Sequence, residues 1–139
     1  MDFLAVAMRW AHILSMAFVV GGTLYARFVL TPALAGLSDG ERTKLRDRIG
    51  AALHPLMFTA VVVLLGSGTF NFLRKASFPA GYHMWFGIKM LLALHVVAVA
   101  LLLGRAGVDA EKQKRWLTGI AVSGVLVMLI SAMLRAMQQ

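Results

Sequence analysis

The sequence predicts an all-α integral membrane protein, a single domain over residues 1–139 that folds as an antiparallel bundle of four transmembrane helices. Hydrophobic residues make up 60% of the chain. Charged residues make up only 14%, whereas soluble domains carry about 25%. The apolar residues also gather in four long stretches, each able to cross the ~30 Å hydrocarbon core of a bilayer. Little chain remains for a separate soluble domain.

Each of the four stretches predicts one helix. The expected helices cover approximately residues 3–30, 49–73, 83–104 and 116–137. Ser38 followed by Glu41 matches the S-x-x-E capping box, which predicts that the second helix begins before its apolar part and outside the hydrocarbon. Pro79 and Gly81 mark the turn before the third helix. The connections are short, so neighbouring helices should be antiparallel.

The distribution of Lys and Arg predicts the orientation of the bundle. The first and third connections hold most of these residues, namely Arg27, Arg42, Lys44, Arg46, Arg48, Arg105, Lys112, Lys114 and Arg115. The opposite side has Arg74, Lys75 and Arg135. The positive-inside rule therefore predicts cytoplasmic loops at residues 31–48 and 105–115, with both termini outside a bacterial-type inner membrane.

The formal charge of +8 does not by itself indicate nucleic acid, because the basic residues lie beside apolar runs and no recognition motif accompanies them. We expect the lipid bilayer as the partner and no nucleic acid. Small residues recur along the predicted helices, including Gly21, Gly66 and Gly124. They allow close helix packing, either within the chain or between copies of it. We expect a homo-oligomer.

Three histidines and one lysine inside the predicted membrane helices are candidate functional residues. The stretch "WFGIKMLLALH" contains Lys89 and His95, although an ionised side chain near the bilayer centre costs about 2.5–3.5 kcal/mol. From the helical rise, His12 and Lys89 lie roughly 13 and 9 Å deep in the outer half. His54 and His95 lie roughly 8 and 14 Å deep in the inner half. Depth therefore predicts two pairs, and Pro55 should kink the helix next to His54.

The residue types limit which cofactor these pairs can hold. The chain has no cysteine, which excludes disulfides and iron–sulfur clusters. Zinc, di-iron and calcium sites need several N, S or O ligands, which the membrane helices do not supply. A haem needs only one or two axial side chains in an apolar slot. The metal-ligating candidates are therefore His12, His54 and His95. Methionine is a soft ligand that copper accepts, but the methionines of this chain are scattered, which indicates a role in core packing.

Three segments resemble a known family. "WAHILSMAFVVGGTLYARFVL" contains His12 and Arg27, "ERTKLRDRIGAALHPLMF" contains Pro55, and Trp85 precedes Lys89 by four residues. These segments resemble the HemJ-type protoporphyrinogen oxidases and the related CopD-like copper-resistance membrane domains. The chain differs from the family pattern at Gly87 and Val19, so the resemblance favours haem binding over protoporphyrinogen oxidation.

The resemblance implies a b-type haem in the membrane and links activity to His12 and Lys89. We therefore expect Lys89 and His12 as catalytic candidates. The cofactor-binding candidates are His12, His54, His95 and Lys89, which would hold one haem b or two. His54 and His95 could hold a second haem by bis-histidine ligation, which suits electron transfer with a quinone.

Three functions stay open at this point. The first is a haem-binding redox protein, with a HemJ-like oxidase of a porphyrin substrate as its most specific version. The second is a non-enzymatic CopD-like protein that handles copper or another small solute. The third is a structural subunit of a larger membrane complex, in which the polar residues are satisfied inside the bundle.

Overall fold

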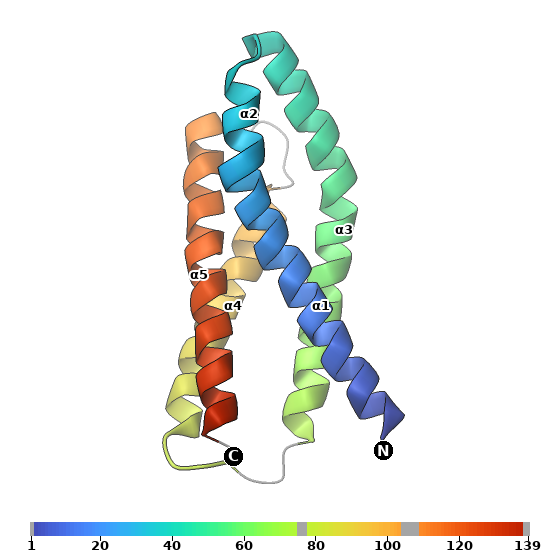
Figure 1. Ribbon diagram of the computed structural model, residues 1–139, viewed down its shortest axis with the longest axis vertical. Helices are drawn as coiled ribbons and strands as arrows, with labels where there is room; N and C mark the ends of the chain where they lie inside the picture. The colour runs from blue at the N-terminus through green and yellow to red at the C-terminus, as the bar shows by residue number, and fades with distance from the viewer. Residues whose placement is uncertain (1, 75–77, 104–108, 138–139) are drawn as a thin grey trace.

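The computed structural model describes residues 2–74, 78–103 and 109–137, and it consists of long helices running up and down one axis (Figure 1). The elements are α1 (Phe3–Tyr25), the π-helical turn η1 (Ala26–Leu30), α2 (Thr31–Ala35), α3 (Asp39–Leu73), α4 (Tyr82–Leu103) and α5 (Ala110–Ala136). Four helices are long and apolar enough to cross a membrane, with α1, η1 and α2 forming one of them. This confirms the predicted all-α four-helix fold.

Two helices extend beyond their apolar stretches. The helix α3 begins at Asp39, where Ser38 and Glu41 form the predicted capping box. Its 35 residues span about 52 Å, far more than the ~30 Å of hydrocarbon, so the helix is long enough for its first turns to lie outside the bilayer, as the capping box predicts. The helix α5 begins at Ala110, before the predicted start near residue 116. Polar residues continue both helices, because helix formation does not require an apolar side chain at every turn.

The first membrane helix contains an irregular turn that the apolar pattern did not predict. Between α1 and α2 the backbone forms the π-helical turn η1, and the Thr31 hydroxyl donates a hydrogen bond to the Ala26 carbonyl oxygen at 2.7 Å. After α2, the guanidinium of Arg42 donates to the carbonyl oxygens of Leu34, Ala35 and Leu37. This arginine therefore closes the α2–α3 hairpin by satisfying carbonyls that the end of a helix leaves unpaired.

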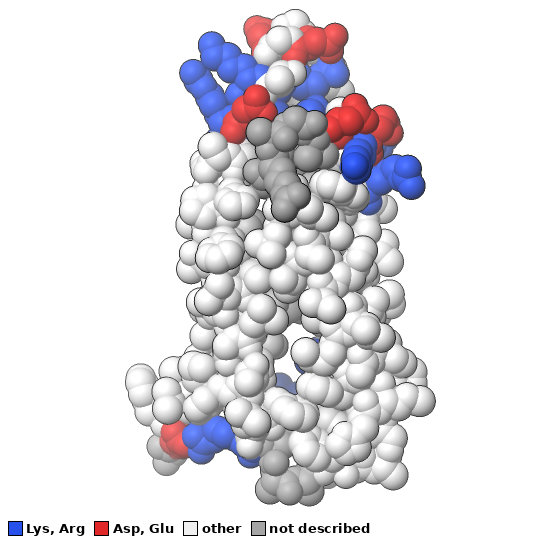
Figure 2. Space-filling model, turned by 180° about the vertical axis from the view of Figure 1, so that it is seen from behind, with Lys and Arg blue, Asp and Glu red and all other residues white. Residues whose placement is uncertain are grey.

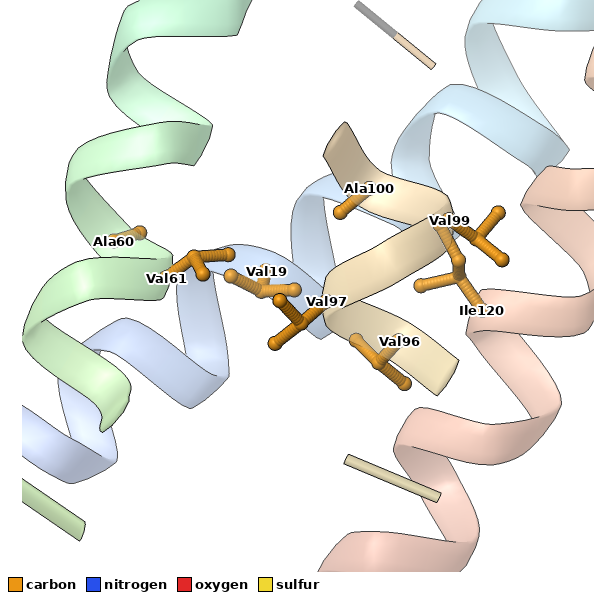
Figure 3. Packing of buried hydrophobic residues seen from close by; sticks show 8 residues of the cluster. All are labelled: Val19, Ala60, Val61, Val96, Val97, Val99, Ala100 and Ile120. Carbon is orange, nitrogen blue, oxygen red and sulfur yellow. The ribbon is translucent and has the colours of Figure 1, made fainter. Parts of the chain in front are cut away.

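Small aliphatic side chains form the centre of the bundle. Val19 of α1, Val61 of α3, Val97 of α4 and Ile120 of α5 pack together there (Figure 3). In lipid, helices associate through close van der Waals packing rather than through exclusion of water. Compact valine and alanine side chains allow that packing around the middle of the bundle.

The bundle is built as two helix pairs. The helix α1 packs most extensively on α3 and α4 on α5, whereas contact between α3 and α4 is slight. Both termini lie at one end, and the α2–α3 hairpin lies at the other (Figure 1). In Figure 2 most of the visible Lys, Arg, Asp and Glu side chains lie at the hairpin end of the bundle, and the surface of its middle part is uncharged. This distribution is expected for a chain that crosses a bilayer. Because α3 and α4 do not close together, space is left between the pairs.

Candidate functional site

A large cavity occupies the end of the bundle where the termini lie, and we call it the terminal cavity. Its volume is about 1040 Å³, and all four long helices line it. Figure 2 shows a hollow in this half of the molecule, with Lys or Arg atoms visible inside. His12 of α1 and Lys89 of α4 both line this cavity. The structure therefore brings together the pair that depth alone assigned to the outer half.

The ring of His12 is held by α3. Its Nδ1 lies 3.2 Å from the carbonyl oxygen of Leu64 and 3.1 Å from the hydroxyl oxygen of Ser67. A carbonyl oxygen only accepts hydrogen bonds, and the Ser67 hydroxyl itself donates to the carbonyl oxygen of Val63 at 2.5 Å. Nδ1 must therefore carry the proton. In the neutral ring Nε2 then has the lone pair, which is the state a metal-ligating histidine needs.

Gly68 makes room for this ring. A Cβ atom at Gly68 would lie 3.1 Å from Cε1 of His12 and 3.4 Å from its Nδ1, closer than ordinary contacts. Glycine therefore lets the imidazole lie against the α3 backbone where Ser67 and Leu64 reach Nδ1. In the sequence Gly68 is one of the recurring small residues that allow close helix packing, and Ser67 was not singled out. No spacing in the chain connects either residue to His12, which is more than 50 residues away.

Positive charge predominates on the lining of the terminal cavity. Arg9 and Arg135 line it together with Lys89 and Arg74. Among the described residues on this lining, the only acidic side chain is that of Asp2, which forms an ion pair with Arg74. The remaining lining is largely apolar and includes Met16 and Met90. The cavity thus combines an apolar body, one histidine with a positioned ring, and cations suited to a carboxylate-bearing ligand.

The two inner histidines do not share a cavity. His54 lines a second cavity near the α2–α3 hairpin, whereas His95 lines neither of the two cavities. The ring of His95 instead lies against α5, with its Nε2 3.4 Å from the position of a Cβ at Gly119. Depth alone placed these residues in the same half of the membrane, but they face different neighbours. Pro55 lies inside α3, which continues as one helix to Leu73.

The structure offers no cluster of ligands for a metal ion held only by histidines and carboxylates. Within the described ranges, no three His, Asp or Glu side chains come together. A cofactor that needs one or two protein ligands is consistent with the terminal cavity, since His12 lies on its lining.

The chain was also compared with known proteins. No protein-family model, no curated protein and no solved structure matches it. The resemblance drawn from the three sequence segments stays a prediction.

Proposed function

We propose that this protein binds one b-type haem in the terminal cavity, with His12 as an axial ligand. The observation that carries the proposal is the orientation of the His12 ring. Its Nδ1 donates to the Leu64 carbonyl and the Ser67 hydroxyl, leaving Nε2 as the basic nitrogen. Histidine ligands of metals typically donate their other ring N–H to a carbonyl or carboxylate in this way, which fixes the tautomer and the ring.

The charge and size of the cavity support the same cofactor. A volume of about 1040 Å³ is at the upper end of the range for ligand sites, ~300–1,000 Å³. A b-type haem carries two carboxylates on a flat apolar ring, and the lining offers Lys89, Arg9 and Arg135 around an apolar body. Buried carboxylates require such cationic partners. Because His54 and His95 do not share a cavity, we propose one haem rather than two.

The proposed activity is membrane redox chemistry. A bound haem supplies one-electron transfer, and the protein's own residues supply binding, orientation and exclusion of water. Lys89 lies on the same cavity as His12, where a neutral amine can accept a proton and a charged one can pair with a carboxylate. The finer versions of the proposal are a HemJ-like oxidation of protoporphyrinogen IX and electron transfer with a quinone.

The visible spectrum of the detergent-purified protein tests the proposal. Protein expressed with sufficient haem should show a Soret band and sharp α and β bands after reduction. His12→Ala should lose most of the bound haem, whereas His54→Ala and His95→Ala should retain it. A colourless wild-type protein would overturn the proposal, and so would a His12→Ala variant with an unchanged spectrum.

Copper handling is a second candidate because Met16 and Met90 line the same cavity as His12. Two thioethers and one imidazole are acceptable ligands for Cu(I). Elemental analysis of the purified protein distinguishes the two candidates. One copper per chain in a wild-type protein without a Soret band would favour this CopD-like function over haem binding. The Met16→Leu and Met90→Leu variants should then lose the copper.

A further inference from the structure

A second cavity lies at the opposite end of the bundle, and the proposed haem site does not use it. Its volume is about 710 Å³, and we call it the hairpin cavity because α2 and the first half of α3 form much of its wall. The last turns of α1, the turn η1, the end of α4 and the start of α5 complete that wall. Most of the lining is apolar, including Phe18, Leu30, Leu53 and Leu117. π-Helical turns such as η1 occur frequently at functional sites.

Basic side chains line this cavity as well. Arg42, Arg46 and Lys114 lie on the lining with His54. Glu111 is the one acidic residue on it within the part of the chain that the structure describes. The guanidinium of Arg42 already binds the carbonyl oxygens at the end of α2 and the carboxylate of Asp39. It therefore has a structural role in the hairpin.

Arg46 differs from Arg42, although both are partly buried. Over residues 2–74, 78–103 and 109–137, no hydrogen bond or ion pair engages the side chain of Arg46 or of Lys114. Arginine is usually held in place by carboxylates, carbonyls or phosphates because its guanidinium donates several hydrogen bonds. A partly buried arginine without such a partner, on the wall of an apolar cavity, indicates an anionic ligand from outside the chain.

The position of the cavity suggests the kind of anion. It lies at the end of the bundle that the positive-inside rule assigns to the cytoplasm, where α3 extends beyond the hydrocarbon. Basic pockets between transmembrane helices on the cytoplasmic side bind the headgroups of anionic lipids. Apolar walls beneath the basic residues suit the acyl chains of such a lipid.

We propose that the hairpin cavity binds an anionic diacyl phospholipid, with its phosphate on Arg46 and Lys114 and its acyl chains against η1 and α3. Two features carry the proposal together. One is an apolar cavity at the predicted membrane surface, and the other is the unpartnered Arg46 on its wall. Neither feature involves His12 or the terminal cavity, so the proposal holds whether or not haem binds.

Native mass spectrometry of the full chain in detergent tests it. Phosphatidylglycerol, phosphatidylcholine of the same chain length and inorganic phosphate are titrated separately. We expect phosphatidylglycerol to bind best. Arg46→Gln should weaken its binding about fivefold, the effect of roughly one charge near a headgroup. Arg48→Gln is the matched control, because Arg48 is exposed on the same helix and does not line the cavity.

A second variant tests the cavity without removing charge. Gly50 lines the cavity, and a Cβ there would meet no atom within 4 Å, so Gly50→Leu should fill space and exclude acyl chains while α3 stays helical. Circular dichroism checks the helical content of every variant. The proposal would be overturned if the two lipids bound equally, or if inorganic phosphate bound as tightly as phosphatidylglycerol. It would also be overturned if Arg46→Gln and Arg48→Gln had equal effects, or if Gly50→Leu bound lipid like the wild type.

Discussion

At the scale of single residues, the hydrogen-bonding capacity of an imidazole distinguishes the three membrane histidines. A polar ring inside a bilayer is unfavourable unless its nitrogens find partners. For His12 the Leu64 carbonyl and the Ser67 hydroxyl provide them for Nδ1. His54 and His95 are exposed at the surface of the chain. Only His12 therefore combines a fixed ring with a position on the terminal cavity.

The first prediction concerns the glycine beneath that ring. In Gly68→Ala the new Cβ would lie 3.1 Å from Cε1 of His12, so the ring must shift away from Ser67 and Leu64. We expect a loss of about 1–3 kcal/mol in the free energy of unfolding, as for other overpacked sites, and a lower haem content. Detergent-phase thermal unfolding and the Soret absorbance measure the two effects.

Gly66→Ala is the matched control for this variant. A Cβ at Gly66 meets no atom within 4 Å, so alanine should be neutral or should stabilise the helix by about 0.5–1 kcal/mol. If both variants behave alike, Gly68 has no role in positioning His12.

At the scale of elements, the contact of α1 with α5 joins the two helix pairs of the bundle. Gly124 of α5 lies at this contact, and an added Cβ there would lie 2.8 Å from a methyl carbon of Val20. Valine has little rotamer freedom in a helix, so the methyl group cannot easily move aside. Gly124→Ala should therefore separate α1 from α5 and lower the free energy of unfolding by about 1–3 kcal/mol.

The double variant Gly124→Ala with Val20→Ala tests the cause of that loss. Removing the methyl groups of Val20 should recover part of the stability, whereas two independent effects would simply add. Gly21→Ala is the control, because a Cβ there meets nothing within 4 Å. Thermal unfolding of the wild type, Gly124→Ala, Val20→Ala and the double variant in one detergent gives the coupling energy between the two positions. Strict additivity would contradict the predicted contact.

The N-terminus of α1 provides a prediction about pH. The carboxylate of Asp2 accepts a hydrogen bond from the Ala5 amide at 3.2 Å and pairs with Arg74 at the end of α3. The Ala5 amide, followed by Arg74, lowers the pKa of this carboxyl below its ordinary value. A lowered folded-state pKa contributes stability above the unfolded value, about 3.9, and that contribution is lost as the pH falls through the folded value.

Asp2→Asn removes the charge but keeps a capping side chain. We expect the variant to be slightly less stable than the wild type near pH 6, with the difference disappearing as the pH falls below about 4. Thermal unfolding in detergent across this range measures it. Asp47→Asn is an exposed control for which no such crossover is expected. A difference between wild type and Asp2→Asn that persists at low pH would contradict the assignment.

The elements also show what apolar pattern can and cannot predict. The four membrane helices follow from hydrophobic length, and the start of α3 follows from the capping box at Ser38. The turn η1 does not follow from hydropathy, because a π-helical turn depends on local backbone hydrogen bonds that hydropathy does not describe. The early start of α5 at Ala110 was missed because its first residues are polar.

At the scale of the whole molecule, depth along the bundle was predictable but direction around it was not. Helical rise predicted that His12 and Lys89 share the outer half of the membrane, and they line one cavity. The same argument placed His54 and His95 together in the inner half, yet they face different elements. Rotation of each helix about its axis is set by contacts such as Ser67 with His12, and a single sequence does not reveal these.

The last prediction concerns the orientation of the bundle in the membrane. Both termini lie at the end opposite the α2–α3 hairpin, and charged residues gather at the hairpin end (Figures 1 and 2). The positive-inside rule places that hairpin in the cytoplasm. Because the chain has no cysteine, single cysteines can report on each end. Gly36→Cys marks the hairpin, and Ala80→Cys marks the turn before α4; both positions are exposed. A membrane-impermeant maleimide should label Ala80→Cys in intact cells, and Gly36→Cys only after the membrane is opened. Labelling in the reverse order would invert the topology and would also place the hairpin cavity at the outer surface.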